Sequence, residues 1–340
     1  MSALEEFLAT HRKRIISGEK KTFRQMASAY ELISEELNDS INQLQRKIER
    51  AKAKGETINR NWLNRQKRLE VLLEQSQDQI ERFGNTASRI ISTEQSNSIR
   101  LGIEYAQESL RLRADTVIRD AGFFNPKIST QAVENAVGFM GNGTPLKKYF
   151  AEQLAPAVAK RIKQEVIKGV ALRKNFNSIA KNLRDAGGIT RQRALTTART
   201  EVLRVYRETT RQIYEENSDI VTEWEWAAAK SARTCVLCLA MDGKRFPVSE
   251  LMPNHVNDRC VMLPVTRLSR PRKNIGSNWF EKQDDKTKRK ILGKEGFTAY
   301  RSGDVALDDF VAFKQHKLFG KSVARKPLAQ VLSEKRISTK

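Results

Sequence analysis

The sequence of 340 residues contains only three cysteines and three histidines, and aromatic residues make up 7% of it. No stretch of about 18 consecutive apolar residues occurs, so we expect no transmembrane helix. Residues 1–13 lack an apolar core flanked by small residues, which argues against a signal peptide. An odd number of cysteines makes a poor disulfide framework. It fits a reducing compartment, where clustered cysteines more often bind metal.

Sequence motifs of common catalytic sites are also missing. There is no Gly-x-Gly-x-x-Gly and no phosphate-binding Gly-Lys-Ser/Thr. His11 and His316 each stand alone in basic surroundings, and we expect both at the surface. The pairs Asp284–Asp285 and Asp308–Asp309 are better explained as solvated charge and helix caps than as nuclease metal ligands. We therefore predict no catalytic residues and a protein that is not an enzyme.

Positive charge is abundant but uneven. The formal net charge is +22, of which residues 1–120 carry +3 and residues 271–340 carry +9. Such a basic field attracts a polyanion through counterion release, although a solvated surface or a flexible tail would carry the same charge. We predict non-specific contact with double-stranded DNA through basic residues near the C-terminus: Arg270, Arg272, Lys273, Lys317, Lys321, Arg325 and Lys326.

Residues 1–120 have the pattern of long helices. Apolar residues recur at alternating spacings of four and three in Leu37, Ile41, Leu44 and Ile48, and again from Trp62 to Phe83. The stretch Ala51–Gly55 interrupts the pattern between them. We predict a hairpin of two long antiparallel helices, whose apolar stripe forms either an internal core or a stalk that docks on a partner.

Residues 121–218 form the second predicted segment, which is helical. Turn residues fill 121–143, and a helical pattern returns from Leu146. A short helix is expected over 175–183, ended by Gly187–Gly188. Thr190 would then cap a long helix over 191–216.

Residues 219–267 form a small β-rich segment. Val221–Trp226 alternates with period two, which predicts a strand with both tryptophans on one face, and further short strands are expected over 246–248 and 261–265. In the last segment, 268–340, we expect a helical region over 279–313 and a basic tail without fixed structure. The predicted fold is mainly α, with a long N-terminal hairpin and a small β-rich Cys/His module.

All three cysteines and one histidine fall in one spaced cluster. Cys235 and Cys238 form a Cys-x-x-Cys knuckle, and His255 and Cys260 follow with four residues between them. This spacing is typical of a structural zinc site with four protein ligands, which leaves no open position for catalysis. A redox pair, a disulfide, or cysteines that are simply small buried residues are the alternatives.

Several motifs surround this cluster: Ala198-Arg199-Thr200-Glu201, Glu223-Trp224-Glu225-Trp226, Arg233-Thr234-Cys235, Asp242-Gly243-Lys244, Pro253-x-His255 and Arg259-Cys260. In these motifs the sequence resembles the phage head-morphogenesis family, the Mu F-like minor head proteins. The resemblance covers residues 190–267 and continues into 279–303. Family members commonly have two cysteines after the histidine, whereas here Asp258 stands in place of the first, so Cys260 becomes the expected fourth ligand and Asp258 an alternative.

The resemblance implies a minor capsid protein of a tailed phage that acts in head morphogenesis. Its expected partners are the portal protein, the scaffold or major capsid protein, and packaged DNA, with a role in DNA packaging or ejection. The expected location is inside the virion head, after assembly in the host cytoplasm without a membrane step. A DNA-acting enzyme or toxin-like effector carried in the head, or a zinc-module DNA-binding regulator, are the competing hypotheses. Glu201 is expected to pair with a nearby arginine rather than to do chemistry.

Overall fold

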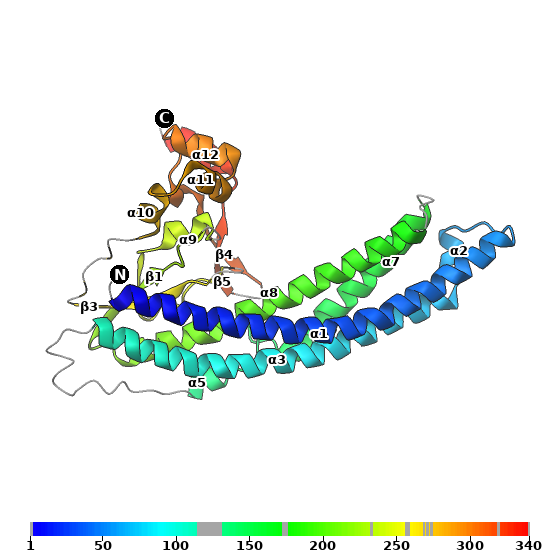
Figure 1. The fold of residues 1–340 in the computed structure, drawn as a ribbon, viewed down its shortest axis with the longest axis horizontal. Helices are drawn as coiled ribbons and strands as arrows, with labels where there is room; N and C mark the ends of the chain where they lie inside the picture. Colours follow the sequence, from blue (N-terminus) through cyan, green and yellow to red (C-terminus); the bar gives the residue numbers. More distant parts are fainter. Residues whose placement is uncertain are drawn as a thin grey trace. The chain divides into compact units, whose positions relative to one another are not determined.

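A computed structural model describes residues 3–113, 131–171, 176–231, 234–255, 259–267, 269, 272, 275–317 and 320–338. They are mainly helical, as predicted, with one small sheet and one strand hairpin (Figure 1). They divide into two compact units. The Cys/His unit comprises Met1–Ser17, Gln95–Val137 and Thr200–Lys340, and the hairpin unit comprises Gly18–Glu94 and Gly138–Arg199.

None of the described helices combines the length and the apolar character that a membrane span requires.

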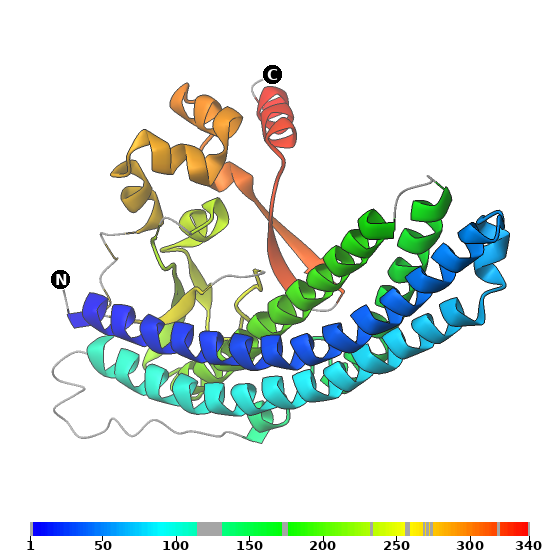
Figure 2. The ribbon, with the colours of Figure 1, turned by 45° about the vertical axis from the view of Figure 1, so that its right-hand side comes forward.

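Two long helices, α1 (Ala3–Ala53) and α3 (Lys67–Arg113), are joined through the short α2 (Arg60–Asn64). In the hairpin unit they run side by side in both views (Figures 1 and 2). The ring of Tyr30 meets Phe83 edge-on at 5.5 Å, and Ser40 Oγ lies 2.6 Å from Gln75 Oε1. As residue numbers increase along α1, those of its contacts on α3 decrease, so the two helices are antiparallel. This confirms the predicted antiparallel hairpin.

The apolar stripe of the sequence forms the core of this hairpin. Leu44 and Ile48 are buried on α1, while the side chains of Leu37 and Ile41 lie outside the described part. Gly55, at a φ of 75°, takes the left-handed conformation that follows many helix ends. The buried residues of the stripe on α2 and α3 are Trp62, Leu69, Leu72, Ile80 and Phe83.

The rest of the hairpin unit packs helices onto this pair. Gly138 and Gly143, both at positive φ, form the predicted turn, which Phe139 and Pro145 close with a β-bridge. A Cβ on Gly84 would lie 2.4 Å from the Cβ of Phe150, so the glycine allows the helices to approach closely. The further elements are α6 (Leu146–Lys148), the π-helix η1 (Tyr149–Leu154) and α7 (Ala155–Ala171).

One predicted helix break does not occur. Helix α8 (Phe176–Glu216) continues through Gly187–Gly188 and Thr190, where we expected one helix to end and another to begin. A glycine inside a helix costs only about 1 kcal/mol relative to alanine. Two glycines in a helix of 41 residues therefore weaken it without ending it.

The Cys/His unit is built around a three-stranded antiparallel sheet of order β2-β1-β3. Trp224 and Trp226 are fully buried, with ring centroids 6.4 Å apart, which confirms that both lie on one face. In the antiparallel pairing of β1 with β3, Trp226 lies opposite Met262. The elements are α5 (Gln131–Glu134), β1 (Val221–Ala227), α9 (Val236–Met241), β2 (Arg245–Pro247) and β3 (Val261–Thr266).

Residues 320–338 are ordered, which corrects the prediction of a tail without fixed structure. Val323 joins the tryptophan core, and Val331 is buried in the neighbouring apolar cluster, so these side chains hold the chain in place. Asn254 also pairs through its backbone with Lys321 and Val323. The elements are α10 (Gly276–Glu281), α11 (Asp285–Leu292), α12 (Lys294–Arg301), η2 (Leu307–Phe310), β4 (Val311–His316), β5 (Gly320–Arg325) and α13 (Leu328–Ser338).

Candidate metal centre

Three of the four predicted ligands converge on one point. Cys235 is the N-cap of α9 and Cys238 lies three residues later, so their side chains share one face of the helix. His255 reaches them from the position after Asn254, whose backbone is hydrogen-bonded to the β5 strand. The ligand atoms of Cys235, Cys238 and His255 all lie within 4.8 Å of one another.

The separations fit the edges of a tetrahedron around a metal ion. The two sulfur atoms are 3.6 Å apart, and His255 Nδ1 lies 3.4 Å from Cys238 Sγ and 3.7 Å from Cys235 Sγ. Tetrahedral zinc, with bonds of about 2.3 Å to sulfur and about 2.0 Å to nitrogen, requires sulfur–sulfur edges of about 3.8 Å and sulfur–nitrogen edges of about 3.5 Å. The three side chains could therefore hold zinc without rearrangement.

The fourth predicted ligand, Cys260, stands beside this group but is not part of it. It is buried at the start of β3, close enough to Cys238 to affect its titration. Its backbone carbonyl accepts a hydrogen bond of 2.9 Å from the Arg207 guanidinium of α8. Asp258, the alternative ligand, lies outside the described residues.

The two knuckle thiols titrate as a pair. A hydrogen bond with Cys238, assisted by His255, lowers the pKa of Cys235 to about 4. The hydrogen bond with Cys235, a further one with Cys260, and burial together raise the pKa of Cys238. One thiolate is thus already favoured where a metal would bind. All three cysteines are free thiols, so the disulfide alternative is not supported.

The site lies where two apolar clusters meet. Cys238 and Cys260 belong to the cluster that contains both tryptophans of β1. Cys235 contacts this cluster and also a second one formed by α9 and the C-terminal helices. A metal held here would cross-link α9 to His255, in the buried interior where both clusters contact Cys235.

The fold around the site can be compared with known proteins. Residues 160–263 match a family model described as phage Mu protein F like protein. The chain carries a phage Mu F-like segment. The match supports the phage head-morphogenesis family that the sequence motifs resemble. No curated protein and no solved structure matches the chain.

The Mu F-like segment contains all four predicted metal ligands and the Ala198-Arg199-Thr200-Glu201 motif. Glu201 is fully buried and accepts a hydrogen bond of 2.7 Å from Arg204 Nε, as expected for a packing role. Arg199 pairs with Glu19 and covers the ring of Phe23 within the hairpin unit.

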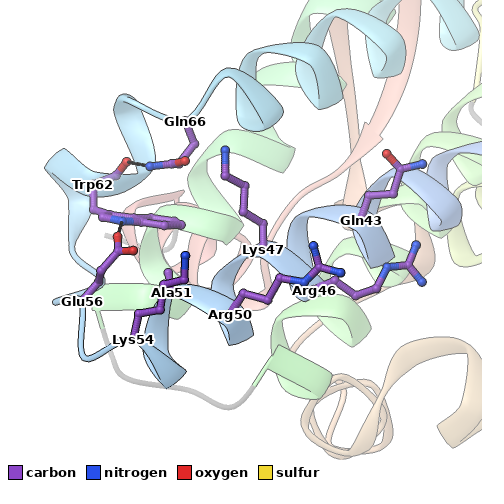
Figure 3. A pocket seen from close by; sticks show the side chains of 9 residues that line it. All are labelled: Gln43, Arg46, Lys47, Arg50, Ala51, Lys54, Glu56, Trp62 and Gln66. Carbon is purple, nitrogen blue, oxygen red and sulfur yellow. Dashed lines mark hydrogen bonds between the residues drawn. The ribbon is translucent and has the colours of Figure 1, made fainter.

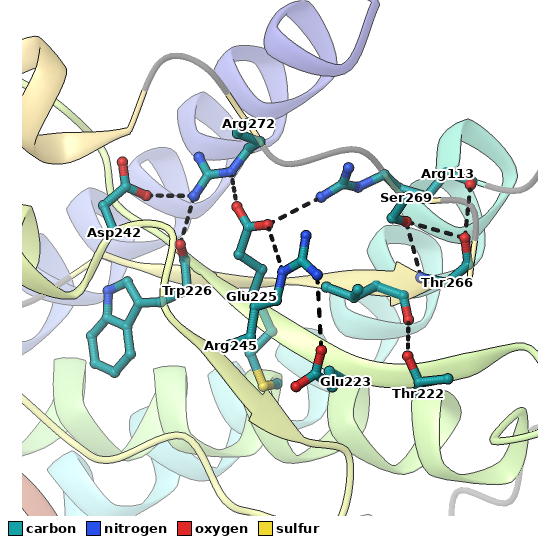
Figure 4. A network of polar contacts seen from close by, with 12 residues as sticks. Arg113, Thr222, Glu223, Glu225, Trp226, Asp242, Arg245, Thr266, Ser269 and Arg272 are labelled. Atoms are coloured by element: carbon teal, nitrogen blue, oxygen red, sulfur yellow. Dashed lines mark hydrogen bonds and ion pairs between the residues drawn. The ribbon is translucent and has the colours of Figure 1, made fainter.

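A buried polar network fixes the orientation of α9 (Figure 4). Arg272 donates to Glu225, to Asp242 at 2.7 Å and to the Trp226 carbonyl at 2.7 Å. Asp242 follows α9 directly and also accepts a hydrogen bond of 2.8 Å from the Ala228 amide. The network therefore ties the end of the cysteine helix to β1. We did not predict from the sequence that Glu225 and Asp242 form a buried network. The position of Glu225 between two tryptophans of the predicted strand could have indicated it.

This network corrects one predicted DNA contact. The Arg272 side chain is only 9% exposed, because both nearby carboxylates bind it, and it cannot reach a phosphate. Arg325 donates to the Leu292 carbonyl at 2.6 Å and covers the Phe310 ring, so its guanidinium is also engaged.

Other predicted DNA contacts remain at the surface. Lys317 is exposed at the end of β4, Lys321 pairs with Glu250, and Lys326 pairs with Glu334 at 2.7 Å. Arg270 and Lys273 lie outside the described residues.

The isolated histidines and carboxylates can now be placed. His316 is exposed, as expected, but His11 is buried, with its Nε2 atom 3.0 Å from the Tyr206 hydroxyl. The apolar face of α1 carries it inward, and burial, ahead of Arg14 and Arg12, lowers the pKa of His11 to about 3. The predicted caps are confirmed: Asp284 accepts from the Thr287 amide and Asp309 from the Ala306 amide.

Proposed function

We propose that the protein is a minor capsid protein that acts in head morphogenesis of a tailed phage. The match of residues 160–263 to the Mu F-like family carries this proposal. The protein would assemble in the host cytoplasm and reside inside the virion head. The contacts of three candidate catalytic carboxylates support a non-catalytic role. Glu201 is ion-paired, and Asp284 and Asp309 cap helices.

The Cys/His site is proposed to hold structural zinc. Cys235, Cys238 and His255 would supply three ligands and Cys260 the fourth, through a small movement toward the group. A bound zinc ion would stabilise the fold by cross-linking these residues. Elemental analysis of the purified chain should find about one zinc per chain. A chain without bound metal would contradict the zinc site and leave the head-assembly proposal intact.

The portal protein is the proposed main partner, with the scaffold or major capsid protein as a further one. The helical hairpin is the proposed docking region, because its two long helices present extended polar faces. Lysine cross-linking in procapsids should join hairpin residues such as Lys20 and Lys52 to the portal. Cross-links from Lys317 or Lys321 alone would instead place docking on the Cys/His unit. Absence of the portal from all complexes would contradict the proposed partner.

Non-specific DNA binding is proposed for three lysines of the C-terminal part, of which Lys317 and Lys321 are exposed and Lys326 is half-buried. Deleting residues 314–340 would not test this, because Val323 and Val331 belong to the core. Replacing Lys317, Lys321 and Lys326 together by glutamine keeps the core intact. Each lost phosphate contact should reduce the salt dependence of duplex binding by about 0.9 in log–log slope. An unchanged slope would remove these residues from the DNA contact.

A further inference from the structure

Four basic residues gather on one side of the chain at the end of α1. Arg46, Lys47 and Arg50 lie in its last turns, and Lys54 follows directly after its end; the steps of one, three and four positions place them on the same side. They line a hollow of about 650 Å³ at the tip of the hairpin unit (Figure 3). This hollow is distinct from the C-terminal surface and from the Cys/His site.

Among the residues that the structure describes, no ion pair involves any of these four cations, whereas Arg199 in the same unit pairs with Glu19. Arg46 and Arg50, and again Arg50 and Lys54, are like charges four residues apart, which repel each other on a helix. The partial negative charge at the end of α1 favours Arg50, in its last turn, by about 0.3–1 kcal/mol, which is of the same order as this repulsion. The cluster therefore adds little to the stability of the hairpin.

The floor of the hollow is fixed by hydrogen bonds. Trp62 Nε1 donates to Glu56 at 2.7 Å, and Gln66 donates to the Trp62 carbonyl at 3.0 Å. The carboxylate of Glu56 is thereby held at the indole. Trp62 and Ala51, the apolar lining residues, are 7% and 5% exposed. A protein partner would find little apolar surface to bury here, although such anchors dominate protein interfaces.

We propose that this hollow binds phosphate groups of a linear polyanion. The planar guanidinium groups of Arg46 and Arg50 match the oxygens of phosphate, and Lys47 and Lys54 add compact charges. At 1.5 Å per residue, Arg46, Arg50 and Lys54 repeat at about 6 Å along the helix. A row of cations suits a row of phosphates better than a single anion. The phosphates belong either to a nucleic-acid strand or to a free oligophosphate.

Titration of the full chain with inorganic tripolyphosphate tests this site. Binding is measured by calorimetry and by the emission of Trp62, identified by its loss in Trp62→Phe. Replacing Arg46 and Arg50 by glutamine should weaken binding about tenfold or more, as expected when two charge-assisted contacts are lost. The matched control replaces Lys52 and Arg82, exposed cations of the same unit outside the hollow, and should change binding less than about twofold.

A labelled oligothymidylate separates the two phosphate sources. If tripolyphosphate displaces the strand from wild type, and the double variant lowers the salt slope of strand binding by about 1.4, the strand uses this site. If the double variant binds the strand as tightly as wild type does but binds tripolyphosphate more weakly, the ligand is a free oligophosphate. Equal affinities of wild type and the double variant for both probes would overturn the proposal. Tighter binding of oligoglutamate of equal charge would overturn it in favour of an acidic protein segment. Neither result bears on portal association.

Discussion

Arg272 of the Cys/His unit and two arginines of the hairpin unit, Arg46 and Arg50, have opposite surroundings. In the Cys/His unit, Arg272 is 9% exposed and bound to two buried carboxylates, Glu225 and Asp242. In the hairpin unit, Arg46 and Arg50 are exposed, and no ion pair among the described residues involves them. Arginines of one unit stabilise the fold, whereas these arginines of the other remain open to a ligand.

This difference shows that net charge does not locate a binding surface. Residues 1–120 carry only +3, yet four cations that form no ion pair within the described part of the chain gather among them. Residues 271–340 carry +9, yet Arg272 and Arg325 serve the fold itself. What decides the role of a cation is whether a buried carboxylate or carbonyl lies within reach.

Loss of the metal knuckle should have the largest effect. Replacing Cys235 and Cys238 by serine removes two ligands that join two apolar clusters. We expect the free energy of unfolding of the Cys/His unit to fall by about 4 kcal/mol or more, because metal binding contributes to folding. Thermal unfolding with and without a chelator measures this. Equal stability of wild type in both conditions would contradict a structural metal.

Breaking the buried network should rank next. In Arg272→Gln the carboxylates of Glu225 and Asp242 stay buried without their main partner. Removing one member of a buried charge pair costs about 3–5 kcal/mol. Chemical denaturation measures the loss, and the exposed Arg267→Gln is the control, expected to change stability by less than about 0.5 kcal/mol. A similar small change for Arg272→Gln would show that the network is dispensable.

His11 should make the Cys/His unit sensitive to acid. Its pKa is about 3 in the folded protein and 6.5 in the unfolded chain, so the unfolded chain binds more protons between these values. Stability should therefore fall as the pH falls from 6.5 toward 3, by up to about 1.4 kcal/mol per pH unit. His11→Gln retains an acceptor for Tyr206 and should flatten this dependence. Denaturation at pH 7 and pH 4 compares the two proteins, and parallel losses would exclude His11 as the cause.

Much of the fold could be predicted because its signals are local. The helical stripe of Leu44 and Ile48 and the alternation around Trp224 each follow from a single periodicity. The Cys-x-x-Cys spacing likewise placed Cys235 and Cys238 correctly beside His255.

The misses depend on contacts between distant residues. The ordered C-terminus depends on Val323 packing against the tryptophan core. The burial of His11 depends on Tyr206, 195 positions away. Nothing local distinguishes Arg272 from exposed arginines, because Glu225 and Asp242 reach it only in the folded unit.

The smallest expected effect gives the sharpest test of the contrast between the units. Arg50→Gln makes the same chemical change as Arg272→Gln, but it relieves repulsion from Arg46 and Lys54 instead of breaking an ion pair. The relieved repulsion, about 0.2–0.5 kcal/mol per pair, is opposed by the lost attraction to the negative end of α1, so we expect the free energy of unfolding to change by less than about 0.5 kcal/mol. Denaturation in low salt and in 1 M salt measures the change and its screening. A loss of several kcal/mol, as expected for Arg272→Gln, would mean that Arg50 has an internal partner after all.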